Sequence, residues 1–267
     1  MYAFAFHRPT SVRQAANLLG KVEDSKLLAG GHTLLPTMKQ RLAAPANLID
    51  LSQITELRGI QRGGRSVTIG AMTRYADIET SSDVKEAIPA LAEMTGLVGD
   101  PHVRHRGTIG GSIANNDPAA DYPAACIALG ATIVTNKRKL HADDYFKSLF
   151  ETALEEGEIV TKVTFPIPQK AAYAKFRNPA SRYALVGVFV AKRGGEIRVA
   201  VTGAGQNGVF RVAAMEEALK KRFAAKSLDG ITVPADGLSS DIHADAEYRA
   251  HLIGVMARRA VAAATGR

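Results

Sequence analysis

The sequence has one cysteine, Cys126, among its 267 residues. A single thiol excludes an internal disulfide, a zinc site built from several thiolates and an iron–sulfur cluster held by four thiolates of this chain. Cys126 stands in the apolar run 124–129, which predicts a small buried hydrophobic residue rather than a reactive thiol. Metal centres built on cysteine are therefore excluded for this chain alone.

Tryptophan and long apolar runs are also absent. No apolar stretch reaches the roughly 20 residues of a membrane-spanning helix, because charges such as Arg8 and Arg13 interrupt every candidate. The first nine residues lack the basic-then-apolar order of a secretory signal. We therefore expect a cytoplasmic protein without a membrane span.

Charge of one sign is in excess: the formal net charge is +8 and the isoelectric point is near 9.6. Such a balance can indicate nucleic acid or a polyanionic ligand. The basic residues are spread along the chain, and no basic run with interleaved aromatics appears. We expect no general nucleic-acid binding, since a polyanionic cofactor or an acidic partner surface explains the charge as well.

Two glycine-containing segments are the most distinctive feature that is present. The first is Ala29-Gly30-Gly31-His32-Thr33, and the second runs from Thr108 to Asp121 through Gly110-Gly111-Ser112. Paired glycines let a backbone approach a ligand closely, and free N–H groups there or at a following helix start favour an anion. One such pair alone would indicate an ordinary strand-to-helix turn. Two pairs indicate a ligand with more than one phosphate.

Helical and strand patterns alternate around these segments. We expect a helix over 12–20 capped by Ser11, strands over 26–29 and 47–51, and mostly helix over 83–97 with Pro89 in a first turn or at a kink. A break at 166–168 precedes three strands and then helices, which predict a separate α+β unit; its strands are 173–176, 184–191 and 196–203, and its helices 212–225 and 247–264.

His102 and His105 have a spacing that metal ligands use. No third ligand is evident nearby, and the flanking Arg104 and Arg106 disfavour a cation electrostatically. We interpret this stretch as a surface loop that leads to the second glycine segment.

The two glycine segments resemble the two flavin loops of a known family. The stretch 29–39 resembles the first loop of the medium, FAD-binding subunit of molybdenum hydroxylases, and 108–121 its second loop in the carbon monoxide dehydrogenase-like form. The xanthine dehydrogenase group is also similar. The resemblance implies an α+β fold: an FAD-binding domain of the PCMH (vanillyl-alcohol oxidase-like) type with subdomains at 1–56 and 57–168, then a C-terminal α+β domain at 169–267 with a three-stranded antiparallel sheet and helices.

The same resemblance implies that FAD lies between the two subdomains. The resemblance gives Asp121 a contact with the polar groups of the cofactor. From the residues alone, Asp121 equally fits the start of a helix, where the helix dipole favours a negative charge. Asn115 and Asp117 are neighbouring candidates. The first loop would hold the pyrophosphate and ribityl part with Ala29, Gly30, Gly31, His32, Thr33 and Leu34; the second would hold flavin and diphosphate with Thr108, Ile109, Gly110, Gly111, Ser112, Asn115 and Asp121.

Three further residues come from the second half of the chain by resemblance. Val160 would pack on the cofactor, Lys175 would reach the FAD, and Tyr183 would lie against the isoalloxazine and shield one side of it. From the residues alone, Val160 is a strand residue facing the core. By the same reasoning, Lys175 is a solvated strand residue.

The implied function is electron transfer through FAD inside a three-subunit molybdenum hydroxylase. A large subunit would hold the molybdopterin cofactor and a small subunit two [2Fe–2S] clusters, which a chain with one cysteine cannot hold itself. The flavin would pass electrons to an external acceptor, without an acid or base from this chain. We expect a dimer of heterotrimers. A free-standing FAD-dependent oxidoreductase of the same fold and a basic nucleotide- or nucleic-acid-binding protein are the alternatives.

Overall fold

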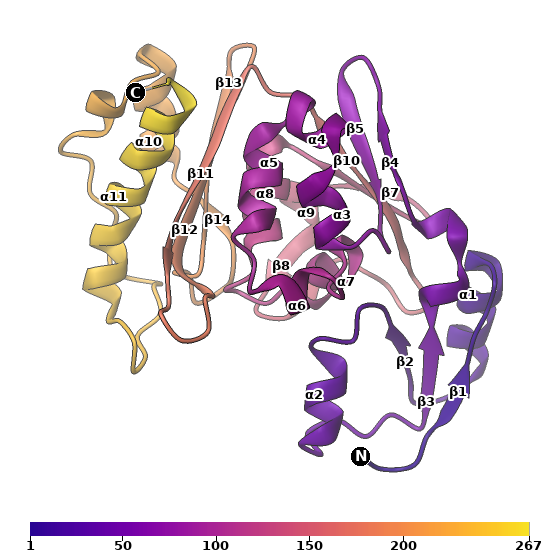
Figure 1. Cartoon of the computed structure of the whole chain (residues 1–267). Helices are drawn as coiled ribbons and strands as arrows, with labels where there is room; N and C mark the ends of the chain where they lie inside the picture. Colours follow the sequence, from indigo (N-terminus) through magenta and orange to yellow (C-terminus); the bar gives the residue numbers. More distant parts are fainter. Residues whose placement is uncertain (267) are drawn as a thin grey trace.

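The N-terminal part of the chain is a small parallel sheet with two helices. The computed structural model describes residues 1–266, and its first region appears in indigo in Figure 1. Strand order is β1-β3-β2, with β1 Ala5–His7, β2 Ser25–Leu28 and β3 Asn47–Asp50, flanked by α1 Val12–Lys21 and α2 Leu34–Lys39. Ser11 accepts a hydrogen bond from the Gln14 N–H and caps α1, as the sequence predicts. Two 3-10 turns, Leu51–Gln53 and Thr55–Leu57, lead out of the region.

The middle region is a five-stranded antiparallel sheet covered by helices (Figure 1). Pro89 is the first residue of α5, so the helix expected over 83–97 is broken at Ile88. In sheet order the strands are β4 Ile60–Arg62, β5 Ser66–Gly70, β10 Val160–Pro166, β6 Thr132–Thr135 and β7 Lys139–His141; a hairpin adds β8 Phe146–Ser148 and β9 Glu151–Thr152. The helices are α3 Tyr75–Thr80, α4 Ser82–Ala87, α5 Pro89–Gly96, α6 Pro101–Arg104, α7 Ile109–Asn115, α8 Asp121–Leu129 and α9 Ala142–Tyr145.

The C-terminal region is an antiparallel sheet with helices on its outer face. The three expected strands are present as β11 Lys170–Arg177, β12 Ala184–Arg193 and β13 Glu196–Thr202, and a two-residue strand β14, Phe210–Arg211, adds a fourth. Helix α10, Ala213–Lys221, is shorter than predicted; a 3-10 turn, Ala225–Leu228, and α11, Ala246–Ala264, follow.

Strand β12 is buried on both faces, which explains its nearly continuous apolar sequence. Val188 and Val190 belong to the core under α10 and α11. Phe189 and Ala191 point the other way and join the core of the middle region. The C-terminal sheet therefore lies between α11 on one side and α5 and α8 on the other (Figure 1).

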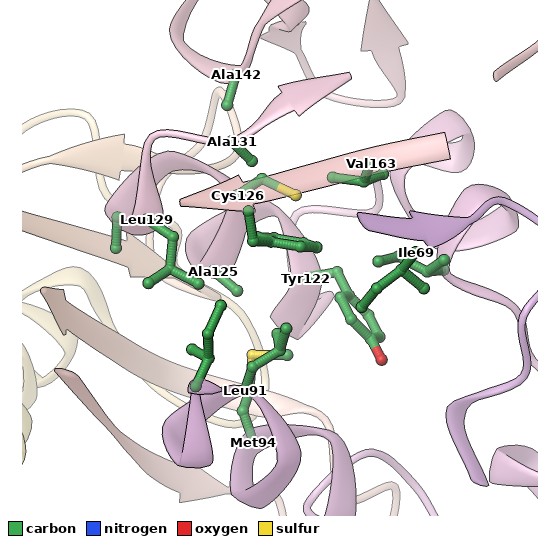
Figure 2. Close-up of a cluster of buried hydrophobic side chains, with 14 of the residues drawn as sticks. Ile69, Leu91, Met94, Tyr122, Ala125, Cys126, Leu129, Ala131, Ala142 and Val163 are labelled. Carbon is green, nitrogen blue, oxygen red and sulfur yellow. The ribbon is translucent and has the colours of Figure 1, made fainter. Parts of the chain in front are cut away.

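Cys126 lies inside the larger core. Figure 2 shows it with Tyr122, Ile69 and Val163 around it, and its side chain has no exposed surface. Burial raises the pKa of the thiol far above its usual range. The prediction of a small packed hydrophobic residue is therefore confirmed. Within residues 1–266, no helix is both long and apolar enough to cross a membrane.

Candidate functional site

The two glycine loops lie far apart in the sequence but against each other in the fold. A methyl group in place of the Gly30 hydrogen would collide with the backbone of Arg106 and Gly107. On the second loop, a Cβ added to Gly111 would lie 3.5 Å from the Cβ of Ala29. The fold therefore brings the two predicted flavin loops together at the junction of the N-terminal and middle regions.

The first loop presents unused backbone donors. Among the described residues, the N–H groups of Gly30, Gly31, His32 and Thr33 have no hydrogen-bond acceptor. Gly31 has φ of +77°, which places this turn in the left-handed region. Consecutive free N–H groups in such a turn form a concavity that suits an anion. This arrangement fits the diphosphate of FAD.

The side chains around the first loop add polar character without forming a metal site. The Nε2 atom of His32 lies 3.2 Å from the carbonyl oxygen of His102, at the single-turn helix α6. His102 on that turn and His105 directly after it are exposed, so the predicted surface position is confirmed, but the stretch forms a short helix and not a loop. No group of three or more His, Cys, Asp or Glu side chains in residues 1–266 has the arrangement of a metal site. Leu34 begins α2 directly after the loop.

The second loop uses its amides differently from what the glycine pattern indicates. Ile109 N–H donates to the Thr73 carbonyl (3.2 Å) and Gly110 N–H to the Ala71 carbonyl (2.8 Å). Thr108 caps α7 by accepting from the Gly111 N–H at 3.2 Å. The bonds from Ile109 and Gly110 hold the start of α7 against the segment 71–73. The close approach requires glycine at position 110, because a Cβ there would lie 2.6 Å from the Ala71 Cβ. The loop therefore offers small side chains and hydroxyls, and the first loop supplies the free amides.

Asp121 and Lys175 form a buried ion pair between the middle and C-terminal regions. Asp121 begins α8, and its Oδ2 lies 2.9 Å from Nζ of Lys175, which also donates to the Leu97 carbonyl at 3.2 Å. The Lys175 side chain is 1% exposed, so the interpretation as a solvated strand residue is wrong. Its strand, β11, lies between α11 on one face of the sheet and α5 on the other, and the paired carboxylate neutralises the buried charge.

Tyr173 completes this group and has no signal in the sequence motifs. Its hydroxyl donates to Oδ1 of Asp121 at 2.5 Å, from the same strand as Lys175 and two residues earlier. Burial raises the pKa of the Asp121 carboxyl, and the Lys175 charge opposes that rise. Burial and the same carboxylate raise the pKa of the Tyr173 phenol. The Asp121 carboxylate is therefore held from two sides.

Tyr183 stands half exposed at the end of the loop between β11 and β12. The Oδ1 atom of Asn178 accepts the N–H groups of Ala180 and Ser181 and fixes this loop. Desolvation raises the pKa of the Tyr183 phenol, and the charges of Asp117 and Asp121 add to the rise. Tyr183 therefore stands at the surface, half exposed, where the negative charges of Asp117 and Asp121 act on its phenol.

Other predicted residues are placed in or beside the middle core. Val160 begins β10 and is 6% exposed, with its side chain in that core. Ser112 and Asn115 lie on α7 and are half-buried. Tyr75, which no motif indicated, packs its ring where a Cβ on Gly107 would fall and lies 5.1 Å from the Tyr122 ring. The Tyr75 ring therefore packs against the backbone just before the second loop, and this contact between distant residues has no signal in the sequence.

Comparison with known proteins identifies the family. Residues 2–168 match the model of the FAD binding domain in molybdopterin dehydrogenase. The carbon monoxide dehydrogenase medium chain of Hydrogenophaga pseudoflava is 38% identical, over 99% of this chain and 98% of that one. The nicotine 6-hydroxylase medium subunit of Paenarthrobacter nicotinovorans is 35% identical over the same shares.

A solved structure shares the whole fold. The carbon monoxide dehydrogenase of H. pseudoflava contains a chain that matches with a TM-score of 0.88 and 39% identity, covering 99% of this chain and 98% of that chain. Similarity of this extent includes the C-terminal region, beyond the part that the family model matches. The chain therefore belongs to the FAD-binding flavoprotein subunits of the molybdopterin dehydrogenase family, of the carbon monoxide dehydrogenase medium-chain type.

Proposed function

We propose that this chain is the electron-transfer subunit of a multi-subunit molybdenum hydroxylase. Its FAD takes electrons from [2Fe–2S] clusters of a small partner subunit and passes them to an external acceptor, while a large partner subunit holds the molybdopterin cofactor. The family membership supports the class of enzyme. The observation that carries the FAD site is the row of free N–H groups from Gly30 to Thr33 beside the glycines of the second loop.

The division of labour between subunits is supported by the chain itself. Relatives that match almost end to end are named as medium chains or subunits, which implies larger and smaller partners. One buried cysteine cannot hold an iron–sulfur cluster of this chain's own. We propose an assembly of two heterotrimers, as in the sequence-based expectation.

Within the subunit, the residues position the flavin and supply no acid or base. The free amides of the first loop would bind the diphosphate, and the Thr108 and Ser112 hydroxyls would approach it from the second loop. Tyr183 would cover one side of the ring system, and the pair of Asp121 and Lys175 would place charge beside it. FAD supplies the redox chemistry, and the surrounding groups tune its potential.

The substrate of the holoenzyme is not encoded in these residues. Relatives named for carbon monoxide and for nicotine have similar identities to this chain, 38% and 35%. Both relatives are named as the medium chain or subunit of their enzymes, although the two enzymes are named for different substrates. Substrate choice in the proposed complex therefore belongs to the large subunit.

A glycine substitution in the second loop tests the FAD site. Gly111→Val places a Cβ 3.0 Å from Thr108 Oγ1 and 3.5 Å from the Ala29 Cβ, and adds two methyl groups to it. We expect the purified variant to lose nearly all bound FAD, seen as lost flavin absorbance, and to keep a cooperative unfolding transition. The matched control is Gly64→Val, because a Cβ at Gly64 meets nothing within 4 Å. Normal FAD content in Gly111→Val would show that the second loop does not bind the cofactor.

A further inference from the structure

The tip of the β8–β9 hairpin carries two adjacent exposed apolar side chains. Leu149 is 49% exposed and Phe150 is 57% exposed. Phe150 also has φ of +56°, a left-handed conformation that is an outlier for an aromatic residue. Such a backbone persists only where its surroundings impose it, and it is found most often at functional positions.

Asn116 imposes this conformation from the end of α7. Its side-chain Nδ2 donates to the carbonyl oxygens of Ser148 and Glu151, both at 2.8 Å, and its own carbonyl accepts from the Phe150 N–H at 3.2 Å. Asn116 is itself left-handed, with φ of +45°, and is 1% exposed. Its Oδ1 is buried without a partner among the described residues, so the amide is oriented for the hairpin alone.

The hydrogen bonds of Asn116 join the hairpin tip to the helix that begins at the second glycine loop. Asn116 directly follows α7, whose first turn contains Gly110 and Gly111. Seven helical residues span about 10 Å. The exposed tip is therefore attached to the far end of the same short helix that begins at the proposed cofactor site.

Segments poor in charge surround the tip, and the exposed Lys147 and Glu151 stand at its edge. Three segments without any Asp, Glu, Lys or Arg meet here, 108–116, 148–150 and 202–210. The Asn116 bonds join the first two, and Gly208 approaches the Ser148 carbonyl, which lies 4.0 Å from a Cβ built there. The Pro118 carbonyl accepts from Gly203 N–H at 2.8 Å and ties the third segment to the others. In a chain with 22% charged residues, an apolar tip with charged residues only at its edge has the composition of an interface, with an apolar centre and a polar rim.

We propose that Leu149 and Phe150 are the docking point for the partner subunit that carries the iron–sulfur clusters. This inference rests on the proposed function, because a donor of electrons to the flavin must bind close to it. The tip offers that partner an aromatic anchor on a backbone that Asn116 already holds, so little backbone freedom is lost on binding. Ile242, at 95% exposure, lacks these features, because it has no apolar neighbour in the sequence and no left-handed backbone.

The test titrates the purified, FAD-loaded chain with the separately purified iron–sulfur subunit of its own enzyme. We expect Phe150→Asp to raise the dissociation constant of the complex at least tenfold, measured by calorimetry or sedimentation velocity. Phe150→Gly removes the same anchor but accepts a positive φ without strain. It should therefore unfold no earlier than the wild type and still bind the partner more weakly. FAD content should stay at the wild-type level in both variants, and Ile242→Asp should bind normally.

The outcomes separate this inference from the function beneath it. Wild-type affinity in both Phe150 variants overturns the docking point and leaves the FAD function intact. A wild-type chain that holds FAD but does not bind the iron–sulfur subunit overturns the proposed function itself. Self-association of the chain alone that Phe150→Asp abolishes, with partner binding unchanged, also overturns the proposal, because a second copy would then occupy the tip.

Discussion

At the scale of single residues, the buried pair of Asp121 and Lys175 has the largest expected effect on stability. Lys175→Met leaves the Asp121 carboxylate buried without its cation, which costs about 3–5 kcal/mol when one partner of such a pair is removed. We expect this loss in the free energy of unfolding, measured by urea denaturation. The double variant with Asp121→Asn should recover most of it. Equal stability of the single and double variants would contradict an ionic role.

The residues of the site divide by the distance of their partners along the chain. Gly31 and Thr108 act through neighbouring backbone, so a local pattern is enough to find them. The role of Lys175 depends on a carboxylate 54 positions away, so alternation along its strand gave the wrong environment. Tyr173, Tyr75 and Asn116 were missed for the same reason. Their hydrogen bonds and packing exist only after the regions assemble.

At the scale of elements, Glu158 holds the turn between β6 and β7 against the start of β10. Burial alone would raise the pKa of its carboxyl, but hydrogen bonds from Arg138, Thr135 and the Glu155 N–H lower it to about 2. A carboxyl with a depressed folded pKa stabilises the fold above its ordinary value of 4.5 and loses that contribution as the pH falls toward 2.

This shift predicts acid sensitivity at one turn. Between pH 5 and pH 2, Glu158 should account for a loss of about 3 kcal/mol in the free energy of unfolding. Glu158→Gln should be less stable than the wild type at pH 7, and the difference should shrink as the pH falls. Denaturant unfolding at several pH values measures both. A difference that does not change with pH would show that the carboxylate charge has no part in it.

Elements with strong local rules were predicted, and elements made by pairing were not. Pro89 begins a helix because its fixed φ and missing N–H suit a first turn, which is one of the two positions that the sequence left open for it. The two-residue strand β14 and the hairpin of β8 and β9 are too short for a periodic pattern. They form because β13 and Asn116 supply partners from elsewhere in the chain.

At the scale of the whole molecule, cofactor binding should stiffen the junction between the first two regions. The free N–H groups of 30–33 have no acceptor in the described part of the chain, so they should exchange quickly without FAD. A bound diphosphate should slow their exchange by roughly tenfold or more. Hydrogen–deuterium exchange with and without FAD measures this, with the buried strand 186–190 as the unaffected reference. Unchanged exchange at 30–33 on FAD binding would remove the first loop from the site.

The two-sided burial of β12 limits how this subunit can be recombined with its relatives. A crossover near Pro168 separates the sequence at an irregular stretch, but the inner face of the C-terminal sheet, which includes Phe189 and Ala191, would then meet α5 and α8 of another protein. Close-packed interiors tolerate few such mismatches. The C-terminal sheet and those two helices therefore form one packing unit, and a functional chimera must take both from the same protein.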